Sequence, residues 1–269
     1  MNQFWILFLA FTVYSFLGWL VESIYCSLHA RKWINRGFLN GPFCPVYGFG
    51  AVLVVTVLDP FRDNLFLLFL AAVVLTSLLE YLTAVLLEAL FHTKYWDYSG
   101  LRFNIQGRVC LENSLMFGGL SVLAVDVLQP AFTFLTARAH PLLIPAAGIV
   151  LSVYFLLDTA LTVNAIYNLN GKLAELQNVL DEIKERAHTA TVETVEALQA
   201  SILVHLDDTT KARLRVLYEN KSRLESGLYA IQRRIIRAFP HMESLRSNES
   251  LQRVRKALQN RAKKIRYRK

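Results

Sequence analysis

The order of hydrophobic and polar positions divides the chain into an apolar part and a polar, highly charged part. Up to residue 166, nearly uncharged runs alternate with short polar connections. The runs cover residues 4–21, 43–58, 64–90, 113–135 and 141–166. A run of about 18 apolar residues or more is typical of a helix that crosses a membrane. The pattern therefore predicts an all-α, polytopic membrane helix bundle of five transmembrane helices.

Two of the runs need a closer look. The run 43–58 has only 16 residues and begins among prolines and glycines. A re-entrant or interfacial segment, leaving four spans, is the alternative there. The run 4–21 follows a leader without a basic side chain, and Glu22 stands where a cleavage site would need small residues. We therefore expect a retained helix and not a signal peptide.

Lysine and arginine residues predict the orientation of the bundle. The connection after the first run carries Arg31, Lys32 and Arg36, and the connection after the third run carries Lys94, Arg102 and Arg108. The other two connections carry one each, Arg62 after the second run and Arg138 after the fourth. Short loops rich in these residues stay in the cytoplasm. The N-terminus is therefore expected outside and the C-terminus inside, in a multi-pass protein of the cell membrane.

The polar part of the chain begins after the last run. Residues 172–269 hold 21 Lys and Arg against 12 Asp and Glu. Apolar residues recur there at steps of three and four, in two seams, the second of which is interrupted by the polar Lys221: Leu173, Leu176, Leu180, Ile183, Ala187; and Leu214, Leu217, Lys221, Leu224, Leu228, Ile231, Ile235. Such seams are typical of coiled coils and helical hairpins. We expect a transmembrane bundle over 1–168, a cytoplasmic coiled coil or helical hairpin over 169–239, and a homo-oligomer or a coiled-coil partner.

A basic amphipathic helix is predicted over 240–269, after Pro240. Residues 233–269 carry 13 Lys and Arg against two Glu. Leu251, Val254 and Leu258 lie on one helical face. Basic segments next to a membrane bind anionic lipids. We therefore expect this helix to lie on the inner leaflet with its apolar face among the headgroups, and we favour membrane lipids over nucleic acid as its partner.

Motifs for soluble catalysis are absent from the sequence. There is no Gly-rich loop followed by Lys-Ser or Lys-Thr, so the chain is not itself an ATPase. It has no nucleophile elbow and no His-Glu-x-x-His motif. Cys26, Cys44 and Cys110 are odd in number and lack the spacing of metal ligands. We expect no disulfide, no metal, no cofactor and no catalytic residues.

Acidic residues in the apolar runs are the main candidates for a site. An ionised group in hydrocarbon is costly and needs a partner or water. Five carboxylates fall near the cytoplasmic ends of the predicted spans: Glu22, Glu80, Glu88, Glu112 and Asp158. We expect an intramembrane polar cluster with Arg36, Arg102 and Arg108 as counter-charges, in which Arg108 pairs with Glu80, Glu88 or Glu112. A set of ion pairs that only fixes helix register is the alternative.

The two cytoplasmic connections share a pattern. Each contains an Asn, a Gly beside an Arg, and a Cys shortly before the next run, and each follows a helix with a late Glu. The pattern is compatible with two related helical hairpins. Gly and Pro at the start of a span can mark unwound backbone that lines a cavity in transporters. An ordinary helix start at Pro42 or Pro45 is the alternative.

The combined motifs resemble a bacterial family described as "putative ABC-transporter type IV", over about residues 4–165. The residues that carry the resemblance are Glu22, Asn35, Arg36, Gly37, Phe38, Leu39, Gly41, Pro42, Pro45, Tyr47, Gly48, Glu80, Tyr81, Glu88, Trp96, Asp97, Tyr98, Ser99, Asn104, Gly107 and Arg108. The resemblance implies a permease-like subunit whose ATPase is a separate chain, with the motif residues of the two connections as its site.

Three functions remain open from the sequence. The first is a membrane transport component with a polar, cytoplasm-facing cavity. The second is an integral-membrane scaffold or sensor that presents a cytoplasmic coiled coil. The third is a membrane enzyme that acts on lipid headgroups, with Glu80, Glu88 and Asp97 beside Arg36 and Arg108. We favour the first, because charged residues in spans often line transport pathways.

Overall fold

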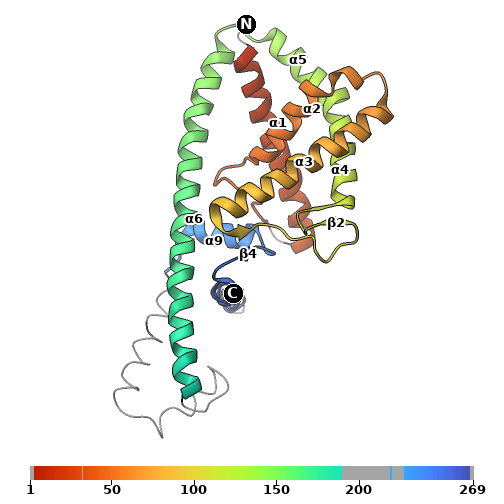
Figure 1. The fold of residues 1–269 in the computed structure, drawn as a ribbon. Coiled ribbons are helices and arrows are strands. Elements are labelled where there is room, and N and C mark those ends of the chain that lie inside the picture. The colour runs from red at the N-terminus through yellow and green to blue at the C-terminus, as the bar shows by residue number, and fades with distance from the viewer. Residues whose placement is uncertain (1–2, 32, 190–218, 220–226, 267–269) are drawn as a thin grey trace. The chain divides into compact units, whose positions relative to one another are not determined.

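The computed structural model describes residues 3–31, 33–189, 219 and 227–266, and these residues are mostly helical (Figure 1). The chain forms two compact units. The first contains residues up to Asn164 together with the later segment Arg237–Met242. The second contains Ala165–Ile236 and Glu243–Lys269. The first unit includes almost all of the predicted membrane-spanning residues and is the one that positions the candidate site.

Four stretches of the described residues are long and apolar enough to cross a membrane: Gln3–Leu28, Leu65–Phe91, Leu111–Arg138 and Leu143–Glu182. The first lies in α1 (Gln3–Ala30), the second is α3 (Leu65–Phe91), and the fourth lies in α6 (Leu143–Thr189). The third consists of α4 (Leu111–Leu123), the π-helical turn η2 (Ala124–Leu128) and α5 (Gln129–Arg138). Each exceeds the ~20 residues that span a bilayer. The chain is thus a helical membrane protein by length and composition.

The run 43–58 forms a shorter helix, α2 (Pro45–Val57), of 13 residues. At 1.5 Å per residue it is about 20 Å long, less than the ~30 Å of a hydrocarbon core. Pro45 stands at the first helical position, where its missing N–H costs nothing. The five-span arrangement therefore stays a prediction, because α2 alone does not reach across a bilayer.

Two pairs of neighbouring helices form the core of the first unit. α1 packs on α2 where Gly48 faces Ser15 and the carbonyl of Phe11, so closely that a Cβ there would clash. α3 packs on α4, and the Ser77 hydroxyl donates to Ser114 Oγ at 2.7 Å. Small residues let membrane helices approach this closely. An apolar cluster of Val54, Leu58, Leu68, Ala72 and Val125 joins the two pairs.

The rod formed by α4, η2 and α5 bends, as Figure 1 shows. Pro130 lies two residues after the π-helical turn and lacks the N–H that a regular helix would use. A π-turn followed by proline is an established cause of a kink. Asp126 in η2 lies 3.9 Å from Arg62, which follows the short 3₁₀ helix η1 (Asp59–Phe61).

Short strands complete the described fold. β2 (Asn104–Ile105) and β3 (Val109–Cys110) pair antiparallel, with Asn104 opposite Cys110 and Ile105 opposite Val109. β1 (Thr93–Lys94) and β4 (Glu243–Ser244) also have two residues each. We call residues 31–44, between α1 and α2, the first connection. Residues 92–110, between α3 and α4, are the second connection and contain the β2–β3 hairpin.

The second unit contains the C-terminal half of α6, most of α9 (Ala230–Ala238), and α10 (Asn248–Arg266). Leu173, Leu176 and Leu180 of the first predicted seam are buried. Gln177 of α6 accepts hydrogen bonds from the backbone and the hydroxyl of Ser250 in α10, at 3.3 and 3.0 Å. The side chains of Ile183 and Ala187, and the seam residues from Leu214 to Leu224, lie outside what the structure describes. The coiled coil therefore stays a prediction.

The structure corrects the expectation about the basic helix and shows a break in the second seam. Leu251, Val254 and Leu258 are buried inside the second unit, so the apolar face of α10 is not free to insert among headgroups. The second seam is also not one continuous helix, because residues 227–229 are not helical and α9 begins only at Ala230. Gln232 accepts from the Tyr229 N–H at 3.0 Å, as a glutamine at the third helical position does in a capping box. As expected, α9 ends just before Pro240.

Candidate functional site

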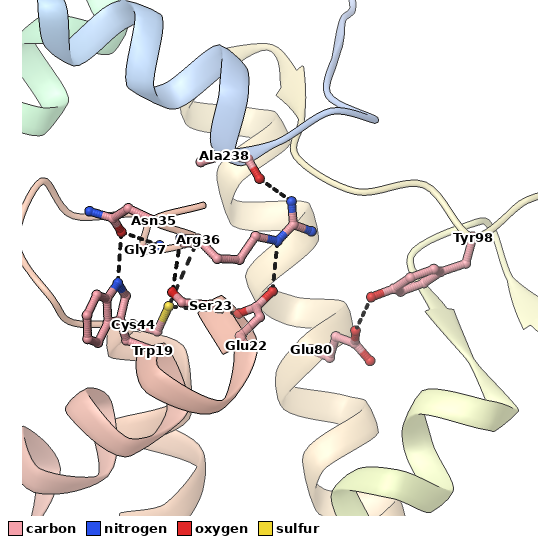
Figure 2. Close-up of polar contacts among 10 residues, drawn as sticks. All are labelled: Trp19, Glu22, Ser23, Asn35, Arg36, Gly37, Cys44, Glu80, Tyr98 and Ala238. Atoms are coloured by element: carbon pink, nitrogen blue, oxygen red, sulfur yellow. Dashed lines mark hydrogen bonds and ion pairs between the residues drawn. The ribbon is translucent and has the colours of Figure 1, made fainter. Parts of the chain in front are cut away.

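The first connection is held in place by Asn35, which interacts with both α1 and its own turn (Figure 2). Its Oδ1 atom accepts from the Trp19 indole N–H at 2.8 Å and from the Gly37 backbone N–H at 3.1 Å. Its amide nitrogen donates to the carbonyl of Asn40 at 3.3 Å. The motif residue Asn35 therefore fixes the backbone on either side of Arg36.

Arg36 joins three parts of the first unit. Its Nε atom lies 3.0 Å from Glu22 Oε1, near the C-terminal end of α1. Its Nη1 atom donates to the carbonyl oxygen of Ala238, at the end of α9 (Figure 2). Its guanidinium carbon lies 5.1 Å from the centre of the Phe239 ring, within cation–π range. Arg36 thus neutralises Glu22 and holds the segment Arg237–Met242.

The second connection is shaped by turns around Gly107. Gly107 has φ +68°, a left-handed conformation that glycine adopts without strain, and a Cβ there would clash with Asp97. Its N–H donates to Asn104 Oδ1 at 2.9 Å, and Tyr98 N donates to its carbonyl at 2.8 Å. Hydrogen bonds from the backbone and hydroxyl of Ser99 lower the pKa of Asp97. Asp97, Asn104 and Gly107 therefore build the loop itself.

Arg108 pairs with Glu88 in a two-pronged ion pair. Arg108 Nη2 lies 2.7 Å from Glu88 Oε2, and Nε lies 3.1 Å from Oε1. Bidentate pairs of this kind are the strong form of the arginine–carboxylate contact. The Arg108 guanidinium also lies over the Tyr81 ring. The backbone carbonyl of Arg108 accepts a hydrogen bond from the Trp96 indole N–H at 2.9 Å. The expected pairing of Arg108 is confirmed, with Glu88 as the partner.

The two connections are built alike. In each, an asparagine accepts from the N–H of a following glycine, and the arginine beside that glycine pairs with a late glutamate of the preceding helix. Cys44 and Cys110 are both buried and directly precede the next helix, α2 and α4. This geometry matches the sequence pattern that the two hairpins share.

Glu80 differs from these paired glutamates. It is buried in α3, and its Oε1 atom accepts from the Tyr98 hydroxyl at 3.2 Å (Figure 2). Its Oε2 atom is buried and has no hydrogen-bond partner in the described part of the chain. The Glu22 carboxylate is close enough to act on it electrostatically. Burial and the nearby Glu80 raise the pKa of Tyr98, so that this hydroxyl stays a donor.

Asp158 lies in the first half of α6 and binds the first connection. Its carboxylate accepts from the backbone N–H groups of Asn40 at 3.0 Å and Gly41 at 2.8 Å. The Tyr154 and Thr162 hydroxyls lie 3.4 and 3.5 Å away. A Cβ on Gly41 would clash with the Tyr154 hydroxyl and crowd Asp158. Pro42 follows in a tight turn that the Phe43 N–H closes onto the Gly41 carbonyl at 2.9 Å.

The remaining predicted residues divide into two groups. Tyr47 lies in the first turn of α2 and interacts electrostatically with Glu22. The centre of its ring lies 5.9 Å from the centre of the Phe117 ring. Glu112 and Arg102 are exposed and do not join the paired residues. Glu112, which was expected in the cluster, lies exposed in the first turn of α4. Among the described residues, no three His, Cys, Asp or Glu side chains are grouped as metal ligands.

Sequence reasoning missed the part that the C-terminal segment takes in the site. Phe239 is buried and contacts Arg36 and also Tyr95, whose ring centre lies 5.1 Å away. No periodicity or spacing in the sequence links residue 239 to the first connection, about 200 residues earlier. The only local signal was the Phe-Pro pair that ends α9.

We use the term polar end of the bundle for the two connections and the six charged side chains that contact them. These side chains are Glu22, Arg36, Glu80, Glu88, Arg108 and Asp158. The connections touch each other, because the Phe38 ring lies 5.6 Å from Tyr95 and 6.1 Å from Phe91. The polar end therefore gathers residues from the membrane-spanning stretches of α1, α3 and α6.

One protein family matches the chain. The family is described as "Putative ABC-transporter type IV", and its sequence model matches residues 9–163. The chain belongs to this family. The match covers the whole polar end, so both charged pairs lie in the family region, whereas Ala238 and Phe239 of the segment Arg237–Met242 lie outside it. No curated protein and no solved structure matches the chain.

Proposed function

We propose that the chain is a membrane transport component, a permease-like subunit whose polar end forms the cytoplasmic entrance of a transport path. The family description and the four long apolar helices support this proposal. The observation that carries it is the polar end itself, which places two ion pairs and two further carboxylates in helices of membrane-spanning composition. Such residues mark pathways for ions and substrates.

We further propose five crossings, with the N-terminus outside and both connections in the cytoplasm. The contact between Phe38 and Tyr95 supports this arrangement, because two connections that touch must lie on the same side of the membrane. The chain between them must then cross twice, once through α3 and once through α2 with the residues that follow it. A re-entrant α2 would place the second connection on the opposite side.

A separate chain is proposed to supply the ATPase activity, since this sequence has no phosphate-binding loop. To test this, the protein is isolated from its native membrane in mild detergent and reconstituted in liposomes with whatever binds it. We expect an ATPase subunit with a phosphate-binding loop to co-purify with the protein in a constant molar ratio. In a complex with the Glu22→Gln variant, we expect the bound ATPase to hydrolyse ATP about tenfold more slowly. This corresponds to a change of about 1.4 kcal/mol in the activation free energy.

Glu112→Gln is the matched control, because Glu112 is an exposed glutamate of the same part of the chain. It should leave the hydrolysis rate unchanged. The transport proposal fails if no such ATPase is bound, or if Glu22→Gln and Glu112→Gln hydrolyse ATP at the same rate.

A scaffold or sensor is the second candidate, and one observation favours it. α6 is a single helix of 47 residues that continues from the first unit into the second. We propose that the second unit recruits a partner, either another copy of the chain or another coiled coil. We further propose that the basic residues of α10 bind anionic lipid through charge alone. The headgroup enzyme is not proposed, because Arg108 is bound to Glu88 and Asp97 is bound to Ser99.

A further inference from the structure

Glu80 is the one carboxylate of the polar end whose charge no described contact compensates. Glu22 and Glu88 each have an arginine, and Asp158 accepts two backbone N–H groups and lies beside two hydroxyls. Glu80 has one neutral donor, the Tyr98 hydroxyl, and a second oxygen without a partner. An ionised carboxylate in this position would carry an uncompensated charge in a low-dielectric setting, which is strongly unfavourable.

Among the residues that the structure describes, no cation is found to act on Glu80. The Glu22 carboxylate of α1 acts on Glu80 electrostatically, and its own arginine, Arg36, is shared with Ala238. Tyr98 and Cys110 come from the second connection, and Tyr47 of α2 lies beside Glu22 and Tyr98. The neighbours are therefore acidic or neutral, and the Glu22 carboxylate opposes a second negative charge.

We propose that Glu80 is a proton-binding site and carries an exchangeable proton in the folded protein at neutral pH. A proton is the ligand that fits, because it neutralises a carboxylate without needing additional space around the buried Oε2 atom. The Tyr98 hydroxyl donates to the other oxygen, which is then the carbonyl of the acid. When the site opens to water, the O–H bond breaks, the proton passes to water, and Glu80 becomes the carboxylate.

This inference deepens the proposed transport function, since a proton site at the cytoplasmic entrance would be the ionisable group of that path. It does not require the ATPase or a substrate. The proton can be observed in the full chain alone, so a failure of the transport proposal and a failure of the proton site give different results.

Infrared spectroscopy of the full chain in lipid bilayers at neutral pH tests the proposal. A protonated carboxyl group has a C=O stretching band that is separate from carboxylate bands and shifts in D₂O. We expect this band in the wild type and its loss in Glu80→Gln. Glu88→Gln is the matched control, because Glu88 lies two turns further along α3 and has Arg108 as its counter-charge. It should keep the band.

A second variant covers the case in which Glu80→Gln does not fold. Tyr98→Phe leaves Glu80 in place and removes only the hydroxyl that donates to it. A C=O group that loses a hydrogen bond absorbs at higher frequency, so the band should move upward. The proposal is overturned if the wild type shows no protonated carboxyl band, if the band survives Glu80→Gln, or if Tyr98→Phe leaves its frequency unchanged.

Discussion

At the scale of single residues, the pair of Arg108 and Glu88 permits a direct stability measurement. Their side chains are 22% and 13% exposed, so the pair is largely buried. Arg108→Ala leaves Glu88 without a counter-charge and should lower the free energy of unfolding by about 3 kcal/mol, the low end for a broken buried pair. Reversible unfolding in detergent measures the change. Adding Glu88→Gln to Arg108→Ala should restore much of the loss.

Arg102→Ala is the control for that experiment. Arg102 is exposed on the same connection, and its loss should change the free energy of unfolding by no more than about 0.5 kcal/mol. If the double variant is no more stable than Arg108→Ala, the pair does not stabilise the fold as the structure implies.

The sequence allowed some of these residue contacts to be predicted and not others. Arg36 and Arg108 each lie in the connection that follows a helix with a glutamate near its end. Their pairing with an acidic residue of the polar end could therefore be expected from proximity along the chain. The contact of Asp158 with Asn40 and Gly41 depends on how α6 lies against the first connection, which no local pattern specifies. The exposure of Glu112 depends on the rotation of α4, which periodicity leaves open when most of a helix is apolar.

At the scale of elements, the segment Arg237–Met242 gives the next prediction. Phe239→Ala removes the ring that contacts both Arg36 and Tyr95, while Arg36 keeps its pair with Glu22. We expect faster hydrogen exchange in residues 237–242 and at the Arg36 backbone, with little change in α3. Hydrogen-exchange mass spectrometry of the protein in detergent measures both regions.

Leu245→Ala is the control, because Leu245 is an exposed apolar residue a few positions further along. Equal exchange in Phe239→Ala and Leu245→Ala would mean that the aromatic contacts do not hold the segment.

The helix ends followed from the sequence where a strong signal marks them. α3 begins after Asn64, whose side chain accepts from the Leu67 N–H at 3.1 Å, and it differs from the predicted run by one residue at each end. α1 extends nine residues past the predicted run, because a single glutamate does not stop a helix when it can pair with an arginine. The break before α9 was missed, although Gly227 stands there, because the seam of apolar residues continues through it.

At the scale of the whole molecule, the membrane topology is the quantity to measure. Single cysteines at positions 61, 139, 33 and 99 are introduced after Cys26, Cys44 and Cys110 have been replaced. A membrane-impermeant thiol reagent on intact cells should label positions 61 and 139 and leave 33 and 99 unlabelled. Labelling after permeabilisation confirms that positions 33 and 99 are reactive. Position 99 decides between the arrangements, since a re-entrant α2 would make it accessible from outside.

Arg36 contacts both Glu22 and Ala238, and this determines the order in which its two contacts can form while the chain is synthesised. The two partners of the Arg36–Ala238 hydrogen bond are 202 residues apart. At about 5–20 residues per second, a ribosome adds Ala238 about 10–40 seconds after Arg36. During that interval α1 to α6 emerge and Arg36 has only Glu22 available. The polar end is therefore made first without the segment Arg237–Met242, which joins it only after the membrane helices have been translated.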